Sequence, residues 1–155
     1  MTSPLDIADR TGQIERVSAE LLQQSALLTR LVVRQMSAGL TRSEAGLLST
    51  LSGGPRRITE LADLEGLAQP TTTLLVKRLE ERGLVRRERP ATDGRVVLVR
   101  LTDDGREALE DFRGRAATIL RGHLEEMTDE QVAALAATTE TLAELVAALQ
   151  GAAAD

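Results

Sequence analysis

The chain has 155 residues, with 19 Lys and Arg against 24 Asp and Glu, a formal net charge of −5. This length allows one domain with a substantial core, and the absence of Cys excludes disulfides, thiol redox sensing and thiolate metal sites. With Phe112 as the only aromatic residue, the core must be aliphatic. No apolar run approaches the ~20 residues of a membrane span and no signal-peptide core is present, so we expect a cytoplasmic protein without membrane partners.

The charge is unevenly distributed along the chain. Residues 1–55 carry no net charge, residues 56–100 carry +3, and residues 101–155 carry −8. A basic segment inside an acidic chain indicates a surface for a negatively charged partner, which the overall charge conceals.

Two helices are expected before residue 55. The first covers about residues 11–36, with Gly39 as its stop signal. The second begins at Thr41-Arg42-Ser43-Glu44, a capping-box pattern, and ends at Gly53-Gly54-Pro55. The apolar positions of the first helix recur close to helical spacing: Ile14, Val17, Leu21, Leu28, Leu31 and Val32.

Residues 58–101 show the order of elements of a winged helix-turn-helix. A short helix over about 59–64 turns at Gly66 into a helix over about 69–82, which Gly83 closes in a left-handed conformation. Two strands near 85–89 and 95–101 then form a hairpin, the wing. Such a module places its second helix in the DNA major groove with the hairpin beside it.

Two more helices complete the chain. The first of them begins after Thr102, its cap, and extends to about Arg121. The last helix begins at Thr128, which forms a capping box with Gln131. Six positions of the last helix make a heptad seam: Val132, Leu135, Thr139, Leu142, Val146 and Leu149. This seam either packs within its own chain or forms a dimer interface, and we favour the interface because the two terminal helices bracket the winged module.

Several short motifs follow one another at defined positions: Leu61-Ala62, the Leu-Glu-x-x-Gly-Leu-Val stretch of residues 79–85, Asp93-Gly94-Arg95, and Leu101-Thr102-Asp103-Asp104-Gly105. Together they make the chain resemble the MarR family of bacterial transcription regulators over nearly its whole length. The resemblance implies a mostly α fold with a small β-hairpin wing and a single domain over 1–155. In it, 40–101 forms the winged helix-turn-helix and 1–39 with 102–155 forms a helical dimerisation region.

The helix over 69–82 presents two different faces. Its inner face should carry Thr72, Leu75, Val76 and Leu79 against the preceding helix, and its outer face should enter the major groove. On that outer face the threonines suit base edges or phosphates, or alternatively cap the helix start, and the basic residues suit phosphates. The predicted DNA-contacting residues of this helix are Gln69, Pro70, Thr71, Thr73, Leu74, Lys77 and Arg78.

Two positions depart from the family pattern. Many relatives have a β-branched apolar residue in place of Thr72 and a basic or polar residue in place of Leu74. An apolar residue at the centre of the outer face contacts thymine methyl groups but forms no hydrogen bond. The operator sequence therefore cannot be inferred from relatives.

In the wing, the predicted DNA-contacting residues are Arg86, Arg89, Asp93 and Arg95. A guanidinium at a hairpin tip suits a narrow A·T minor groove, and the resemblance implies that Asp93 orients Arg95. The alternative for the other arginines is an ordinary solvated hairpin.

The resemblance implies a homodimeric, sequence-specific DNA-binding regulator, a repressor by expectation, whose DNA affinity a small organic effector changes. Its partners would be a second copy and a pseudo-palindromic operator in double-stranded DNA. No cofactor or metal is expected, since His123 is the only His. An enzyme is disfavoured because no nucleophile–base pair or phosphate-binding loop is found. The alternative function is a winged-helix protein-interaction module without DNA readout.

Overall fold

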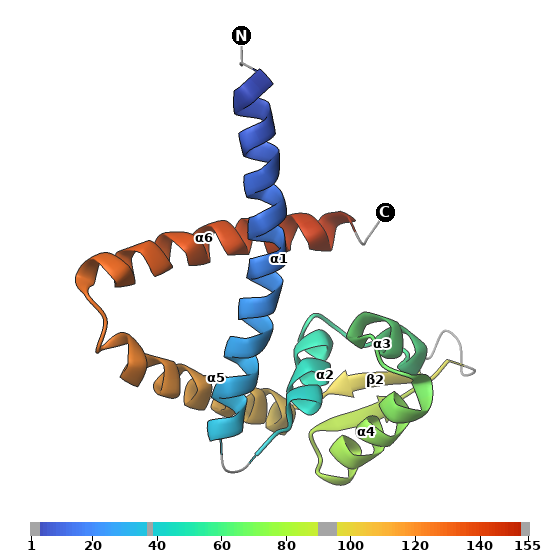
Figure 1. Cartoon of the computed structure of the whole chain (residues 1–155). Helices are drawn as coiled ribbons and strands as arrows, with labels where there is room; N and C mark the ends of the chain where they lie inside the picture. Colours follow the sequence, from blue (N-terminus) through green and yellow to red (C-terminus); the bar gives the residue numbers. More distant parts are fainter. Residues whose placement is uncertain (1–3, 37–38, 90–95, 153–155) are drawn as a thin grey trace. The chain divides into compact units, whose positions relative to one another are not determined.

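The computed structural model describes residues 4–36, 39–89 and 96–152, and for residues 4–8 and 152 it describes the backbone alone. The described chain is mostly helical with one antiparallel hairpin, as Figure 1 shows. Its contacts divide it into two compact units, Met1–Ala116 and Ala117–Asp155. The elements are α1 (Pro4–Gln35), α2 (Arg42–Ser52), α3 (Ile58–Glu65), α4 (Gln69–Glu81), β1 (Val85–Glu88), β2 (Leu98–Leu101), α5 (Asp103–Leu124) and α6 (Asp129–Ala152).

The predicted helix caps are confirmed. At the start of α2, the Glu44 backbone N–H donates to the Thr41 hydroxyl oxygen at 3.2 Å, and the Thr41 N–H donates to the Glu44 carboxylate at 2.8 Å. Thr128 and Gln131 make the same reciprocal pair before α6, at 3.0 and 3.3 Å. Gly66, which ends α3, has a φ of 61°. These local signals fix helix ends because each depends on residues only a few positions apart.

Three predicted boundaries were wrong. α1 begins at Pro4 rather than near Thr11, and a proline fits the first helical turn because its missing N–H has no partner there in any case. α5 extends beyond Arg121 to Leu124. β2 begins at Leu98 rather than at residue 95, because Leu98 pairs with Glu88, the last residue of β1.

The base of the wing is tied to the segment before α3. β1 and β2 pair in antiparallel register from Val85 opposite Leu101 to Glu88 opposite Leu98. On the other edge of β2, Val99 exchanges two backbone hydrogen bonds with Arg56, at 2.8 and 3.1 Å. Because Arg56 lies two residues before α3, this bridge fixes the wing relative to the helix-turn-helix.

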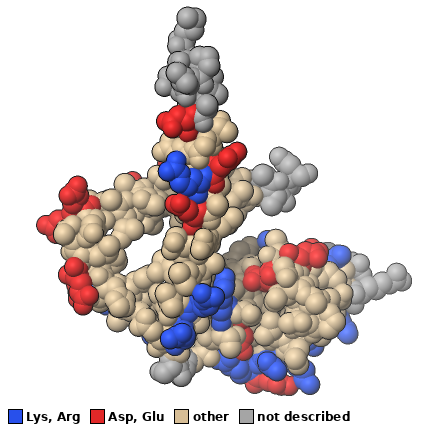
Figure 2. Space-filling model, viewed as in Figure 1, with Lys and Arg blue, Asp and Glu red and all other residues tan. Residues whose placement is uncertain are grey.

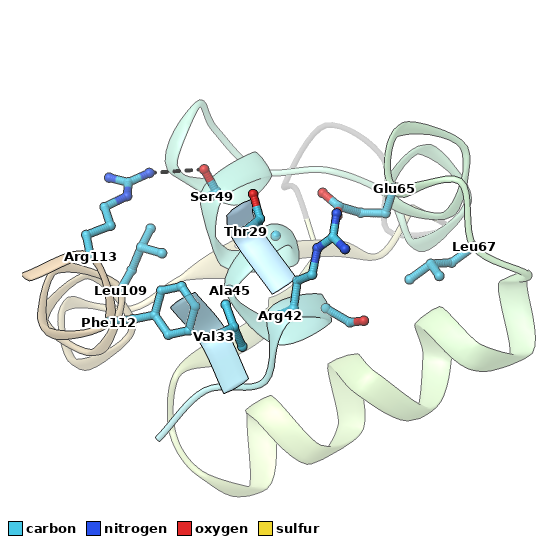
Figure 3. A pocket seen from close by; sticks show the side chains of 12 residues that line it. Thr29, Val33, Arg42, Ala45, Ser49, Glu65, Leu67, Leu109, Phe112 and Arg113 are labelled. Carbon is cyan, nitrogen blue, oxygen red and sulfur yellow. Dashed lines mark hydrogen bonds between the residues drawn. The ribbon is translucent and has the colours of Figure 1, made fainter. Parts of the chain in front are cut away.

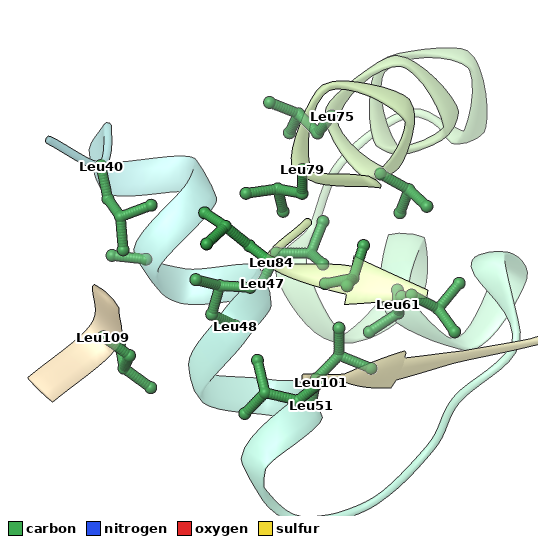
Figure 4. Packing of buried hydrophobic residues seen from close by; sticks show 14 residues of the cluster. Leu40, Leu47, Leu48, Leu51, Leu61, Leu75, Leu79, Leu84, Leu101 and Leu109 are labelled. Carbon is green, nitrogen blue, oxygen red and sulfur yellow. The ribbon is translucent and has the colours of Figure 1, made fainter. Parts of the chain in front are cut away.

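A single aliphatic cluster holds the winged module together, and Figure 4 shows leucines from α2, α3, α4, the hairpin and α5 converging in it. Phe112 lies at its edge, so the expectation of a core built from aliphatic residues is confirmed. Full burial of a leucine or valine contributes about 1.5–3 kcal/mol. The largest fully buried side chains are Leu47, Leu48, Leu51, Leu61, Leu79, Val76, Val85, Val99 and Thr72.

The first turn of α5 packs directly against the base of the hairpin. The Thr102 hydroxyl donates to the Gly83 carbonyl at 2.7 Å and accepts from the Gly105 N–H at 3.1 Å. A Cβ on Gly105 would overlap the Leu84 carbonyl oxygen and meet the Leu101 side chain. The glycine of the Leu-Thr-x-x-Gly motif is therefore required by close packing.

α6 is the most apolar helix and is exposed along its length. Of the predicted seam, Val132, Leu135, Val146 and Leu149 are exposed. Residues 129–151 pass a test for a membrane-spanning helix on length and mean hydropathy, with a value of 1.5 and no residue buried. The expectation that no segment has this character was wrong for α6. A helix that passes on these grounds alone is weak evidence for a membrane span, because core helices of soluble proteins pass as well.

Candidate nucleic-acid interface

The two faces of α4 are separated as the sequence predicts. Thr72, Leu75, Val76 and Leu79 are buried, and the last three belong to the aliphatic cluster that also contains Leu61 of α3. Their spacing follows the helical period, so one side of α4 is committed to the core. The opposite side is left facing solvent.

Every predicted outer-face residue of α4 is exposed. The hydroxyls of Thr72 and Thr73 donate to the carbonyls of Ala68 and Gln69, at 3.3 and 2.9 Å. The N-cap of α4 is Ala68, without a side-chain cap hydrogen bond, so the alternative that a threonine caps the helix start was wrong. Lys77 faces Glu81 at 3.8 Å, and both side chains are largely in solvent, where such a pair is weak. The exposed residues are Gln69, Pro70, Thr71, Thr73, Leu74, Lys77 and Arg78.

The wing arginines are partly neutralised by acids. Arg100 holds Glu88 through two contacts, each of 2.8 Å, one from its Nε and one from a terminal nitrogen. Arg86 lies 3.7 Å from the same carboxylate, and Arg87 lies 3.3 Å from Glu80. The hydrogen bond from Arg100 lowers the pKa of Glu88 below its usual value of 4.5, because it favours the charged carboxylate.

Arg89 is exposed just after β1, at the start of the wing loop. Two further predicted site residues, Asp93 and Arg95, lie outside the described residues. The predicted orientation of Arg95 by Asp93 therefore stays a prediction.

The ionic contacts of the described residues were not predicted from the sequence, and two of them show why. Glu44, which caps α2, is 6% exposed and accepts a hydrogen bond from Arg82 at the end of α4 at 3.2 Å. The 38 positions between them leave no local signal. The Glu88–Arg100 pair was predictable in principle, because Arg86 lies directly opposite Arg100 and Glu88 is therefore its diagonal neighbour across the hairpin.

Charge is also sorted over the surface. Figure 2 shows acidic side chains gathered around the turn between α5 and α6, where Glu125, Glu126, Asp129 and Glu130 are all exposed. Basic and acidic side chains are interleaved over the winged module in the same view. The acidic C-terminal segment thus accounts for the negative net charge of the whole chain.

A cavity of about 550 Å³ lies within the first unit, lined by α1, α2, α5 and the end of α3. Phe112, Leu109 and Val33 form an apolar part of its lining in Figure 3. Arg42 and Arg113 also line it, and a terminal nitrogen of Arg113 donates to the Ser49 hydroxyl at 3.0 Å. No residue of this cavity was predicted from the sequence, because its walls come from four helices that are separated along the chain.

The model of the MarR family matches residues 38–96, which cover the helix-turn-helix and the start of the wing described above. The HTH-type transcriptional repressor MdtR of Bacillus subtilis is 28% identical over 107 residues, 68% of this chain and 69% of MdtR. The chain belongs to the MarR family of winged-helix transcription regulators.

Solved MarR-family structures extend the similarity to most of the chain. Sco3205 of Streptomyces coelicolor, solved in complex with DNA, is 29% identical with a TM-score of 0.54, covering 86% of this chain and 87% of that one. The PcaV regulator of the same species, solved with its natural ligand, is 26% identical with a TM-score of 0.52, covering 92% and 98%. The protein is thus a transcriptional regulator of this family and not an enzyme.

Proposed function

We propose that this protein is a cytoplasmic, homodimeric repressor that binds a pseudo-palindromic operator and changes its DNA affinity when a small organic ligand binds. The observation that carries the proposal is the exposed outer face of α4 beside an arginine-rich wing. Similarity to Sco3205, which was solved with DNA, and to MdtR, a repressor, supports it.

DNA binding would use the two elements for different tasks. α4 enters the major groove, where Gln69 and Thr71 face base edges and Lys77 and Arg78 neutralise phosphates. The wing lies along the neighbouring minor groove, where Arg89 and Arg95 meet the negative potential of A·T-rich sequence. Phosphate neutralisation supplies most of the affinity, which therefore falls steeply with added salt.

A second copy would cover the apolar side chains that α1 and α6 expose. Ile14, Val17 and Leu28 of α1 are each at least half exposed, and α6 adds its heptad positions. Large exposed apolar patches mark protein interfaces. A two-fold dimer then presents two copies of α4 to half-sites about one helical turn apart.

The cavity lined by α1, α2, α5 and the end of α3 is the candidate effector site. Its lining carries two arginines, Arg42 and Arg113, against one acid, Glu65, and an apolar wall at Phe112, a combination suited to a small organic anion. Such a ligand regulates only if it binds one arrangement of the winged modules better than the other. PcaV, which was solved with its natural ligand, supports an effector for this protein.

A charge-matched pair of double variants tests DNA binding. Lys77→Ala with Arg78→Ala removes two positive charges from α4, and Arg10→Ala with Arg16→Ala removes two from the exposed face of α1. Fluorescence anisotropy over a salt series, using the promoter next to the protein's own gene, should show weaker binding for the α4 pair. Its salt slope should fall by about 0.9 for each phosphate that the variant no longer neutralises. Equal effects of both pairs would contradict α4 as the DNA-binding element.

A further inference from the structure

An apolar side chain occupies the centre of the outer face of α4. Leu74 is 49% exposed and is not part of the aliphatic cluster. Pro70 lies one turn before it and Arg78 one turn after it, both exposed, because helical residues four apart share a face. Successive residues turn a helix by about 100°, so Leu74 points nearly opposite to the buried pair Leu75 and Val76.

Two threonines next to Leu74 have their hydroxyl protons engaged within the helix. The Thr73 hydroxyl donates its proton to the Gln69 carbonyl at 2.9 Å. Thr72 is buried, and its hydroxyl donates to the Ala68 carbonyl. Lys77 lies beside Glu81, farther along the helix. Lys77 and Arg78 keep donors one turn farther along, so the apolar surface at the centre of this face is the side chain of Leu74 itself.

Thymine is the base whose major-groove edge carries a methyl group, whereas the other edges present hydrogen-bond donors and acceptors. A leucine satisfies none of those donors and acceptors but buries a methyl group well. Building on the proposed DNA-binding function, we infer that Leu74 is a specificity-determining residue that contacts the methyl group of one thymine in each half-site. Burial of one methyl group corresponds to about fourfold in affinity per half-site.

The test begins with the full-length protein and a pool of random duplexes. Selection should enrich a pseudo-palindrome with a thymine at one fixed position of each half-site. Each thymine of the selected duplex is then replaced in turn by deoxyuridine, which removes the methyl group and keeps the base pairing. At the fixed position the Kd should rise about fourfold per half-site, and the Leu74→Ala variant should bind the thymine and deoxyuridine duplexes equally.

Leu64→Ala is the matched control, since Leu64 is 60% exposed but lies on α3. This variant should keep the preference for thymine over deoxyuridine, and circular dichroism should show that both variants are folded. Three results overturn the inference: no methyl effect in the unmodified protein, an effect that persists in Leu74→Ala, or an effect abolished equally in Leu64→Ala. Failure to enrich any sequence would instead overturn the proposed sequence-specific DNA binding.

Discussion

At the scale of single residues, Glu88 limits the positive charge of the wing. Its carboxylate holds Arg100 through two 2.8 Å contacts and lies 3.7 Å from Arg86, one of the predicted DNA-contacting residues. A pair this close to solvent contributes little to stability, but it removes charge from the surface that would face DNA. If the wing contacts DNA as proposed, Glu88 lowers the non-specific affinity for DNA.

Glu88→Gln should tighten binding to any duplex, because the wing gains one unit of positive charge, and should increase the salt slope. Anisotropy measurements against Glu20→Gln, on the exposed surface of α1, provide the comparison. Unchanged affinity would show that the wing does not approach DNA.

The same variant carries a pH prediction. The hydrogen bond from Arg100 lowers the pKa of Glu88 in the folded protein, so the stabilisation is fully present above the usual value of 4.5 and is lost as pH falls through the lowered pKa. The melting temperature of Glu88→Gln should therefore lie below that of the unmodified protein at pH 7, and the gap should close in acid. A gap that is constant with pH would rule out the ionic origin.

At the scale of elements, close packing joins α5 to the wing. Gly105 leaves no room for a side chain beside the Leu84 carbonyl, and Thr102 links Gly83 to the first turn of α5. A second link, from Glu44 to Arg82, joins the start of α2 to the end of α4. The position of α4 thus depends on contacts at both ends of the winged module.

Gly105→Ala should destabilise the protein by about 1–3 kcal/mol, because the added methyl group forces the hairpin away from α5. Gly114→Ala is the matched control on the same helix, where an added Cβ meets nothing within 4 Å. That change should stabilise the protein by about 0.5–1 kcal/mol through helix propensity. Urea unfolding of both variants measures the difference, and equal effects would contradict the packing explanation.

At the scale of the whole molecule, α6 leaves apolar side chains exposed that the proposed homodimer would cover. Val146 is 43% exposed and Leu149 63%, both on the predicted heptad seam. Val146→Glu should therefore shift a homodimer towards monomer and weaken operator binding, because two half-sites are then bound independently. Thr141→Glu, on the other side of the exposed helix, should leave the dimer intact.

Sedimentation velocity on both variants and on the unmodified protein measures whether each is a monomer or a dimer. A monomeric unmodified protein would overturn the homodimer proposal, and recovery of the unmodified protein only in the membrane fraction would favour a membrane role for residues 129–151 instead.

The sequence by itself determined the order of elements, the helix caps and the two faces of α4. Each depends on residues within about one helical turn, such as Thr41 with Glu44 or Thr72 with Val76, so local spacing is sufficient. The MarR-family motifs could also be recognised from the sequence, because each is a short continuous segment of the chain. The DNA-contacting roles of individual residues, including Asp93 and Arg95, stay predictions.

Only the tertiary structure decided what depends on residues distant in sequence. Arg82 reaches Glu44, Val99 pairs with Arg56, and the cavity takes its walls from four helices. No periodicity encodes these contacts, because they follow from how the elements pack after each has formed. The sequence also did not show that position 105 requires a glycine. That requirement comes from the Leu84 carbonyl, which packs against Gly105 only in the folded structure.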